Sequence, residues 1–148
     1  MKVLFLDFDG VLNTDRFVRV NQQFGLCLEP SKLMYLKEIV NKTNAHIVIH
    51  SSWRMYFDKT GSHYICKYIN DEFMKYGLVI DDCTRIDLRR KESIEDYIVR
   101  HDLKEYVIVD DMYLSSTLID NHFIKTDAHY GITDQIKNEI IKMLGANY

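Results

Sequence analysis

The sequence predicts an α/β fold, a three-layer Rossmann-like parallel sheet with helices on both faces. Short, continuous apolar runs alternate along the chain with longer stretches whose apolar residues recur at helical spacing. The strongest runs are rich in Val and Ile, which is typical of strands buried on both faces. No repeat or Gly/Ser-rich linker divides the chain. We therefore expect one domain over residues 1–148.

The expected elements alternate in a strand–helix rhythm. Strands are predicted at 3–6, 46–49 and 106–109, with weaker candidates at 78–80 and 122–124. Helices are predicted from Ser31 to about Lys42, over 65–76, around 94–98, and from about Thr133 to 144. Pro30 suits the first turn of its helix, and Gly77 suits the end of the second. Ligands of such sheets bind at the carboxyl ends of the strands, so that edge is where chemistry is expected.

Composition narrows the functional classes. With 19 basic and 22 acidic residues the net charge is −3, which excludes a strong global field for nucleic acid but allows a local basic face. The three cysteines are widely spaced, which favours reduced thiols and a cytoplasmic location over a disulfide framework. The N-terminal apolar run is too short and too acidic for a signal peptide, and no run approaches a membrane span. We expect a soluble protein with no membrane contact.

Carboxylates follow two of the three strong strands. Asp7 and Asp9 follow the first, and strand alternation would turn both to the same side. Asp110 and Asp111 follow the third. If these strands are neighbours, four carboxylates converge and need a cation, for which Mg²⁺ is the hard ion that suits oxygen ligands. Either pair alone is equally compatible with a turn or a helix cap.

Polar and basic residues occupy the remaining positions near this edge. Ser51 and Ser52 follow the second strand, where a hydroxyl and neighbouring N–H groups can hold a phosphate oxygen or cap the next helix. Arg54 can pair with phosphate or cover a neighbouring ring. Arg90 and Lys91 precede the helix around 94–98, where a cation can neutralise the carboxylates or lie in solvent.

The order of these motifs resembles the haloacid dehalogenase (HAD) superfamily. Its four signature elements appear in sequence over residues 3–111, and the first of them, VLFLDFDGVLN at 3–13, is a specific match. The stretches SSWR at 51–54 and TD…GIT at 126–133 look like a capless, phosphatase-like branch similar to the HAD domain of bacterial RNA-repair proteins. The resemblance implies minimal or no cap, so an open site is expected.

The resemblance also assigns roles to the acidic residues. It makes Asp7 the nucleophile and Asp9 the general acid/base of an aspartyl-phosphate mechanism. It implies Mg²⁺ binding by Asp7, by Asp110 and through the backbone carbonyl of Asp9, with Asp111 assisting.

The same resemblance implies a phosphate-binding set. Ser51 would hold the transferring phosphoryl group, and Lys91 is preferred over Arg90 as the basic catalytic residue. Ser52, Arg54 and Arg90 are the expected substrate-binding residues.

Two functions remain open on this sequence. The first is an Mg²⁺-dependent phosphomonoesterase whose substrate is a phosphorylated small molecule, a nucleotide or a nucleic-acid end. The alternative is a regulatory module that binds metal and phosphate without turnover.

Overall fold

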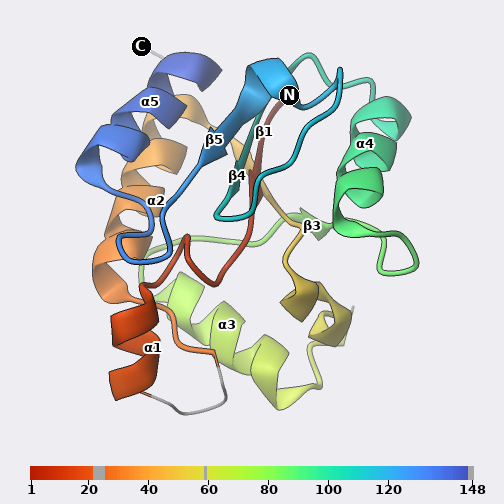
Figure 1. The fold of residues 1–148 in the computed structure, drawn as a ribbon. Coiled ribbons are helices and arrows are strands. Elements are labelled where there is room, and N and C mark those ends of the chain that lie inside the picture. Colours follow the sequence, from red (N-terminus) through yellow and green to blue (C-terminus); the bar gives the residue numbers. More distant parts are fainter. Residues whose placement is uncertain (22–25, 59, 147–148) are drawn as a thin grey trace.

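The computed structural model describes residues 1–21, 26–58 and 60–146, which build a parallel sheet flanked by helices (Figure 1). The sheet has five strands in the order β3-β2-β1-β4-β5, and every neighbouring pair is parallel. The strands are β1 (Lys2–Leu6), β2 (His46–Ile49), β3 (Asp82–Cys83), β4 (Glu105–Asp110) and β5 (Phe123–Lys125). The predicted strands at 3–6, 46–49, 106–109 and 122–124 are therefore confirmed.

Four helices fall close to their predicted positions, and α1 (Asp15–Val20) is a short helix that was not predicted. The four are α2 (Pro30–Thr43), α3 (Tyr64–Met74), α4 (Arg90–Arg100) and α5 (Asp134–Leu144). Two 3₁₀ turns, η1 (Ser52–Tyr56) and η2 (Asp120–His122), complete the described elements. Pro30 stands in the first turn of α2, where its missing N–H costs nothing. The Thr133 hydroxyl caps α5 by accepting a hydrogen bond from the Ile136 N–H at 3.2 Å.

Side-chain alternation along β1 sorts the core into two layers. Leu4 and Leu6 pack in the cluster that also contains the buried faces of α2, α3 and α5. Val3 and Phe5 point to the opposite face, in the cluster that contains the buried face of α4. Figure 1 shows α4 on one side of the sheet and α2 and α5 on the other. The predicted three-layer α/β architecture with helices on both faces is confirmed.

The predicted strand at 78–80 is wrong. Leu78 is buried, but its N–H donates to the Phe73 carbonyl at 3.0 Å, so it closes the end of α3 instead of joining the sheet. Val79 is 67% exposed. The sheet contact begins at Asp81, whose N–H donates to the Ile47 carbonyl at 2.9 Å, and β3 follows at Asp82–Cys83. The apolar run thus reflects a helix C-terminus and not a buried strand.

The register brings three chain segments to one edge of the sheet. Leu6 is paired with Ile49 on one side and with Val109 on the other. The ladder continues past the strands, since the His50 N–H donates to Leu6 at 3.0 Å and the Asp7 N–H donates to Val109 at 3.2 Å. The residues that follow β1, β2 and β4 are therefore fixed side by side by backbone hydrogen bonds.

Two further expectations bear on the setting of this edge. Among the described residues, no helix is both long and apolar enough to cross a membrane. The three cysteines are free thiols, as predicted. The short segment 13–29 contributes α1 near the same edge (Figure 1), although residues 22–25 within it lie outside the described residues.

Candidate active site

Three carboxylates from two neighbouring strands meet at the edge of the sheet. One oxygen each of Asp7, Asp110 and Asp111 lies within 4.8 Å of the others. Asp7 and Asp110 are buried, while Asp111 is partly exposed. The pairing of β1 with β4 explains this convergence, because it places the residue after Leu6 beside the end of β4. We call these three residues the acidic cluster.

Arg90 is the cation that reaches the acidic cluster. Its Nη1 donates to Asp7 Oδ2 at 3.0 Å and to Asp110 Oδ2 at 2.7 Å. The first residue of α4 thereby lies between the two buried carboxylates. Lys91, one position later, was the preferred basic residue but makes no such contact in the described structure, whereas Arg90 does. Among the described residues, Arg90 is the one cation in contact with these three carboxylates, which leaves an excess of negative charge.

Burial and the neighbouring charges shift the carboxyl pKa values of the cluster in both directions. Burial and the neighbouring Asp110 raise the pKa of Asp7 to about 7, although Arg90 opposes the rise. Burial, together with Asp110, also raises the pKa of Asp111. Burial acts to raise the pKa of Asp110 as well, but its hydrogen bond with His50 and its other donors win and hold it below its ordinary value. The cluster therefore favours either a bound proton or a bound cation.

His50 supports the cluster from the end of β2, and no role was predicted for it. Its ring is fully buried, and Nε2 lies 2.9 Å from Asp110 Oδ2. Burial lowers the pKa of this imidazole, which favours the neutral form. Its Nδ1 has no hydrogen-bond partner among the described residues. The sequence did contain a sign of this role, because His50 is a titratable residue that directly follows the apolar strand β2.

The donor set fits a hard divalent cation. The cluster offers only carboxylate oxygens, the ligands that Mg²⁺ prefers, and burial together with neighbouring carboxylates raises the pKa of two of its three members. Asp7, Asp110 and Asp111 are the side chains that would hold the ion. Asp9, which was expected to bind the ion through its backbone carbonyl, does not add its side chain to this group.

Asp9 has a separate environment of neutral donors. Asn13 Nδ2 donates to its Oδ1 at 3.1 Å, and the Trp53 indole Nε1 donates to its Oδ2 at 2.8 Å. Asn13 is itself held, because its Oδ1 accepts from the Gly10 N–H at 3.0 Å. β1 ends at Leu6, so strand alternation does not extend to Asp9 and does not turn it toward Asp7. Neither Asn13 nor Trp53 was predicted as a site residue.

Gly10 makes the tight turn between these two environments possible. Its φ is +77°, a left-handed conformation that other residues rarely adopt. A Cβ at this position would lie 2.5 Å from Asp111 Oδ2. Its carbonyl accepts from the Thr126 hydroxyl at 2.6 Å, which ties the turn to the segment after β5. The backbone at Gly10 therefore lies directly against the Asp111 carboxylate of the acidic cluster.

Gly10→Ala is expected to weaken Mg²⁺ binding as well as the fold. The left-handed φ alone costs about 1–2 kcal/mol, and the added methyl group must also displace the Asp111 carboxylate. Thermal unfolding and a calorimetric Mg²⁺ titration measure the two effects. The matched control is Gly77→Ala, because Gly77 has a φ of +69° and nothing within 4 Å of its Cβ position. Equal Mg²⁺ affinity in both variants would contradict the prediction.

The serines after β2 lie in different environments. Ser51 is fully buried, and its Oγ caps η1 by accepting from the Trp53 N–H at 3.2 Å. Its hydroxyl proton is not used by that bond. Ser52, the first residue of η1, is exposed.

Arg54 was expected to bind substrate, but its side chain packs inward. Its Nη1 donates to the carbonyls of His50 and Ser51 at 3.0 and 3.1 Å. Its Nη2 donates to the carbonyls of Arg85 and Leu88 at 3.3 and 3.0 Å. The side chain is only 7% exposed, because it clamps the turn after β2 to the segment before α4. It thus holds in place the two segments that carry Ser51 and Arg90.

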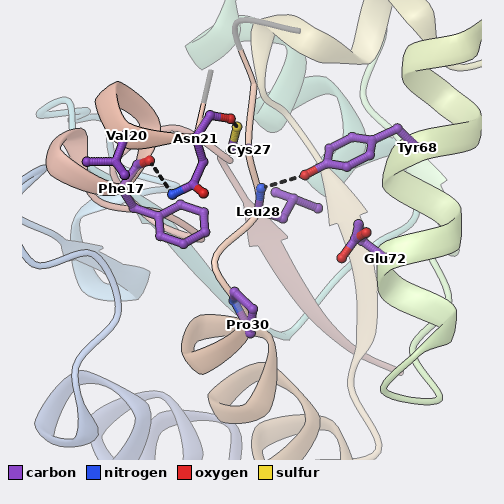
Figure 2. A pocket seen from close by; sticks show the side chains of 8 residues that line it. All are labelled: Phe17, Val20, Asn21, Cys27, Leu28, Pro30, Tyr68 and Glu72. Atoms are coloured by element: carbon purple, nitrogen blue, oxygen red, sulfur yellow. Dashed lines mark hydrogen bonds between the residues drawn. The ribbon is translucent and has the colours of Figure 1, made fainter. Parts of the chain in front are cut away.

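A hollow of about 460 Å³ lies away from the carboxylates, between α1 and α3. Figure 2 shows its lining side chains: Phe17, Val20, Asn21, Cys27, Leu28, Pro30, Tyr68 and Glu72. The Tyr68 hydroxyl accepts from the Leu28 N–H at 3.1 Å across it. Asn21 and Cys27 flank residues 22–25, which lie outside the described residues. Glu72 is the one carboxylate among its lining residues, so this hollow does not reproduce the acidic cluster.

The parallel sheet, the carboxylates after β1 and β4, and the cation at the start of α4 together define a HAD-type α/β domain. The family described as the HAD domain in Swiss Army Knife RNA repair proteins matches residues 3–136, and the chain belongs to this family. No curated protein and no solved structure matches the chain. The family suggests a phosphatase-type hydrolase with a phosphorylated substrate.

Proposed function

We propose that the chain is an Mg²⁺-dependent phosphomonoesterase that acts on nucleotides or nucleic-acid ends through an aspartyl-phosphate on Asp7. The observation that carries this proposal is that two carboxylates close in sequence, Asp7 and Asp9, lie in different environments. Asp7 lies in the charged cluster with Arg90, whereas Asp9 is held by neutral donors outside it. Paired acids in different environments are a recurrent basis for dividing nucleophile from acid/base.

In the first step a carboxylate oxygen of Asp7 attacks phosphorus. The bond between phosphorus and the ester oxygen breaks, and Asp9 in its protonated form gives its proton to that departing oxygen. The product alcohol leaves, and the phosphoryl group stays on Asp7. The Ser51 hydroxyl donates a hydrogen bond to a phosphoryl oxygen and keeps its proton, and Arg90 screens the charge of the attacking carboxylate.

In the second step Asp9, now a carboxylate, takes a proton from water. The oxygen of that water attacks phosphorus, and the bond to Asp7 breaks. Inorganic phosphate is released, and Asp7 and Asp9 return to their starting protonation states. Asn13 and Trp53 keep the Asp9 carboxylate in one orientation through both proton transfers. A bound Mg²⁺ supplies positive charge that neutralises carboxylates and phosphate.

Nucleotides and nucleic-acid ends are the proposed substrates for two reasons. The family to which the chain belongs is described by RNA repair. The carboxylates also border a hollow lined by Asp9, Asp111 and residues of α1, which leaves room for a group beyond the phosphate. A localisation in the cytoplasm agrees with the free thiols.

The test is phosphate release from a panel of phosphoesters, with Mg²⁺ and with EDTA. The panel contains mononucleotides, sugar phosphates, and oligonucleotides with a 3′- or 5′-phosphate. Mg²⁺-dependent release, fastest from nucleotides or oligonucleotides, is the expected result. Mg²⁺ binding by calorimetry without release from any substrate would overturn the proposal and favour the non-catalytic metal- and phosphate-binding module.

Trp53→Phe is expected to lower kcat selectively for substrates with poor leaving groups. The ring is kept but its N–H is lost, so Asp9 is held by Asn13 alone. A hydrogen bond to a charged group stabilises by about 1.5–3 kcal/mol, so we expect about a tenfold fall in kcat for a nucleoside monophosphate. p-Nitrophenyl phosphate, whose leaving group needs little protonation, should change less than about twofold.

Tyr56→Phe is the matched control for Trp53→Phe. The Tyr56 ring packs 5.8 Å from the Trp53 ring, centroid to centroid, so this variant alters the same surroundings without removing the donor to Asp9. Equal loss on both substrates in Trp53→Phe would mean that the indole is merely structural.

A further inference from the structure

A groove leads away from Asp9 between α1 and the loop at 126–130. Its volume is about 390 Å³, within the range of small-molecule sites. Its lining includes Asp9 and Asp111 together with Val18, Arg19 and Ala128. The walls are joined by the backbone, since the Asp15 N–H donates to the Ala128 carbonyl at 3.0 Å. The groove is therefore a formed part of the fold.

The position of Asp9 fixes what this groove can receive. A general acid must lie within hydrogen-bond reach of the oxygen that it protonates. The alcohol bonded to that oxygen then extends on the Asp9 side of the phosphate and not on the Arg90 side. The groove on that side has side walls formed in part by Val18 and Ala128, which suit an organic group with an apolar face.

Arg19 gives the groove a cation with no partner. In the part of the chain that the structure describes, its exposed guanidinium makes no ion pair or hydrogen bond. Asp9 and Asp111 also line the groove, while a third acid of the groove, Asp15, is directed to His129, with 2.7 Å between Oδ2 and Nδ1. An anion beside the leaving group would thus meet Arg19 unopposed by that carboxylate.

We infer that this groove binds the leaving group of the substrate, a nucleoside unit whose second phosphate contacts Arg19. This inference rests on the proposed function and narrows it. An apolar base beside Val18 and Ala128, with an anion at Arg19, is the chemistry of a nucleotide at the end of a strand and not that of an uncharged alcohol. Arg19 is accordingly a specificity-determining residue for nucleic-acid ends over nucleoside monophosphates.

The test compares Arg19→Ala with the matched control Arg16→Ala. Arg16 lies on the same short helix and is exposed, but it lines a different hollow, together with Thr14 and Glu29. The substrates are dinucleotides with a 3′- or a 5′-phosphate, the corresponding nucleoside monophosphates, and p-nitrophenyl phosphate. We expect Arg19→Ala to raise KM for the preferred dinucleotide about fivefold, the size of an exposed charge pair, with the other substrates and Arg16→Ala unchanged.

A second variant tests the groove without altering charge. Ala128→Leu fills the wall opposite α1 and is expected to raise KM for the dinucleotide, while acetyl phosphate, which has a small leaving group, is unaffected. A wild-type preference for a sugar bisphosphate, or equal KM changes in Arg19→Ala and Arg16→Ala, would overturn the inference. Both results require turnover by the wild type, whereas absence of turnover on every substrate would refute the proposed function itself.

Discussion

Asp7→Asn is expected to lose more than about 10³-fold in kcat, because the amide cannot form the aspartyl-phosphate. The same variant is expected to be more stable than the wild type in Mg²⁺-free buffer above pH 7. Loss of activity together with a gain in stability would separate removal of the nucleophile from damage to the fold. Phosphate release and urea unfolding, each at pH 8 with and without Mg²⁺, measure the two effects.

The stability gain follows from the pKa of Asp7. In the folded protein the carboxyl keeps its proton up to about pH 7, whereas in the unfolded chain it loses it near 3.8. The folded state thus binds more protons between these values, so wild-type stability falls as the pH rises through this window. The difference corresponds to at most roughly 4 kcal/mol, and Asp7→Asn removes this loss. The variant should therefore gain about 2–4 kcal/mol at pH 8 and little near pH 4.

Asp71→Asn is the control for the loss of a carboxylate. Asp71 is exposed on α3 and pairs with Lys67 at 2.9 Å, far from the chemistry. It should change neither kcat nor the pH dependence of stability. Wild-type kcat in Asp7→Asn would rule out the aspartyl-phosphate mechanism, and a pH-independent difference in stability would contradict the raised pKa.

Arg90→Ala is expected to lower kcat by about 10²–10³-fold, the usual cost of removing one preorganised donor from a charged transition state. The guanidinium contacts both Asp7 and Asp110, so its removal leaves the cluster without a cation from the protein. Breaking a buried ion pair on one side costs roughly 3 kcal/mol, which should appear as lower stability in Mg²⁺-free buffer. Saturating Mg²⁺ should restore much of the stability but not the turnover.

Lys91→Ala and Arg90→Lys test the assignment of the basic position. Lys91 makes no contact with the cluster in the described structure, and its removal should change kcat less than about threefold. Arg90→Lys keeps the charge but loses the planar fork, so intermediate activity is expected. A larger loss in Lys91→Ala than in Arg90→Ala would reverse the assignment.

Most of the sheet could be predicted from the sequence, because its buried strands are short, continuous runs of apolar residues. Continuous apolar runs such as those at 3–6 and 106–109 have no helical alternative at that length. The run at 78–80 was a weaker candidate, and its role depended on the Phe73 carbonyl, which the end of α3 leaves free to accept from the Leu78 N–H. The difference between a short strand and a helix terminus lies in backbone hydrogen bonding, which composition does not reveal.

The acidic cluster was predictable for the same reason. Once β1 and β4 are neighbours, the residues that follow them must converge. The partners of Asp9 were not predictable, because Asn13 and Trp53 reach it from separate turns and carry no sign of that contact in their local sequence. The choice between Arg90 and Lys91 likewise depended on which of two adjacent side chains the start of α4 turns inward.

The contact between Trp53 and Asp9 also gives the protein an optical probe. Trp53 is the sole tryptophan of the chain, so all indole emission arises from one ring whose N–H donates a hydrogen bond to Asp9, the proposed acid/base. Metal binding at the neighbouring cluster, phosphate binding or an alcohol entering beside Asp9 each alters the surroundings of that single fluorophore. Unlabelled protein thereby reports occupancy of its own reaction centre in real time.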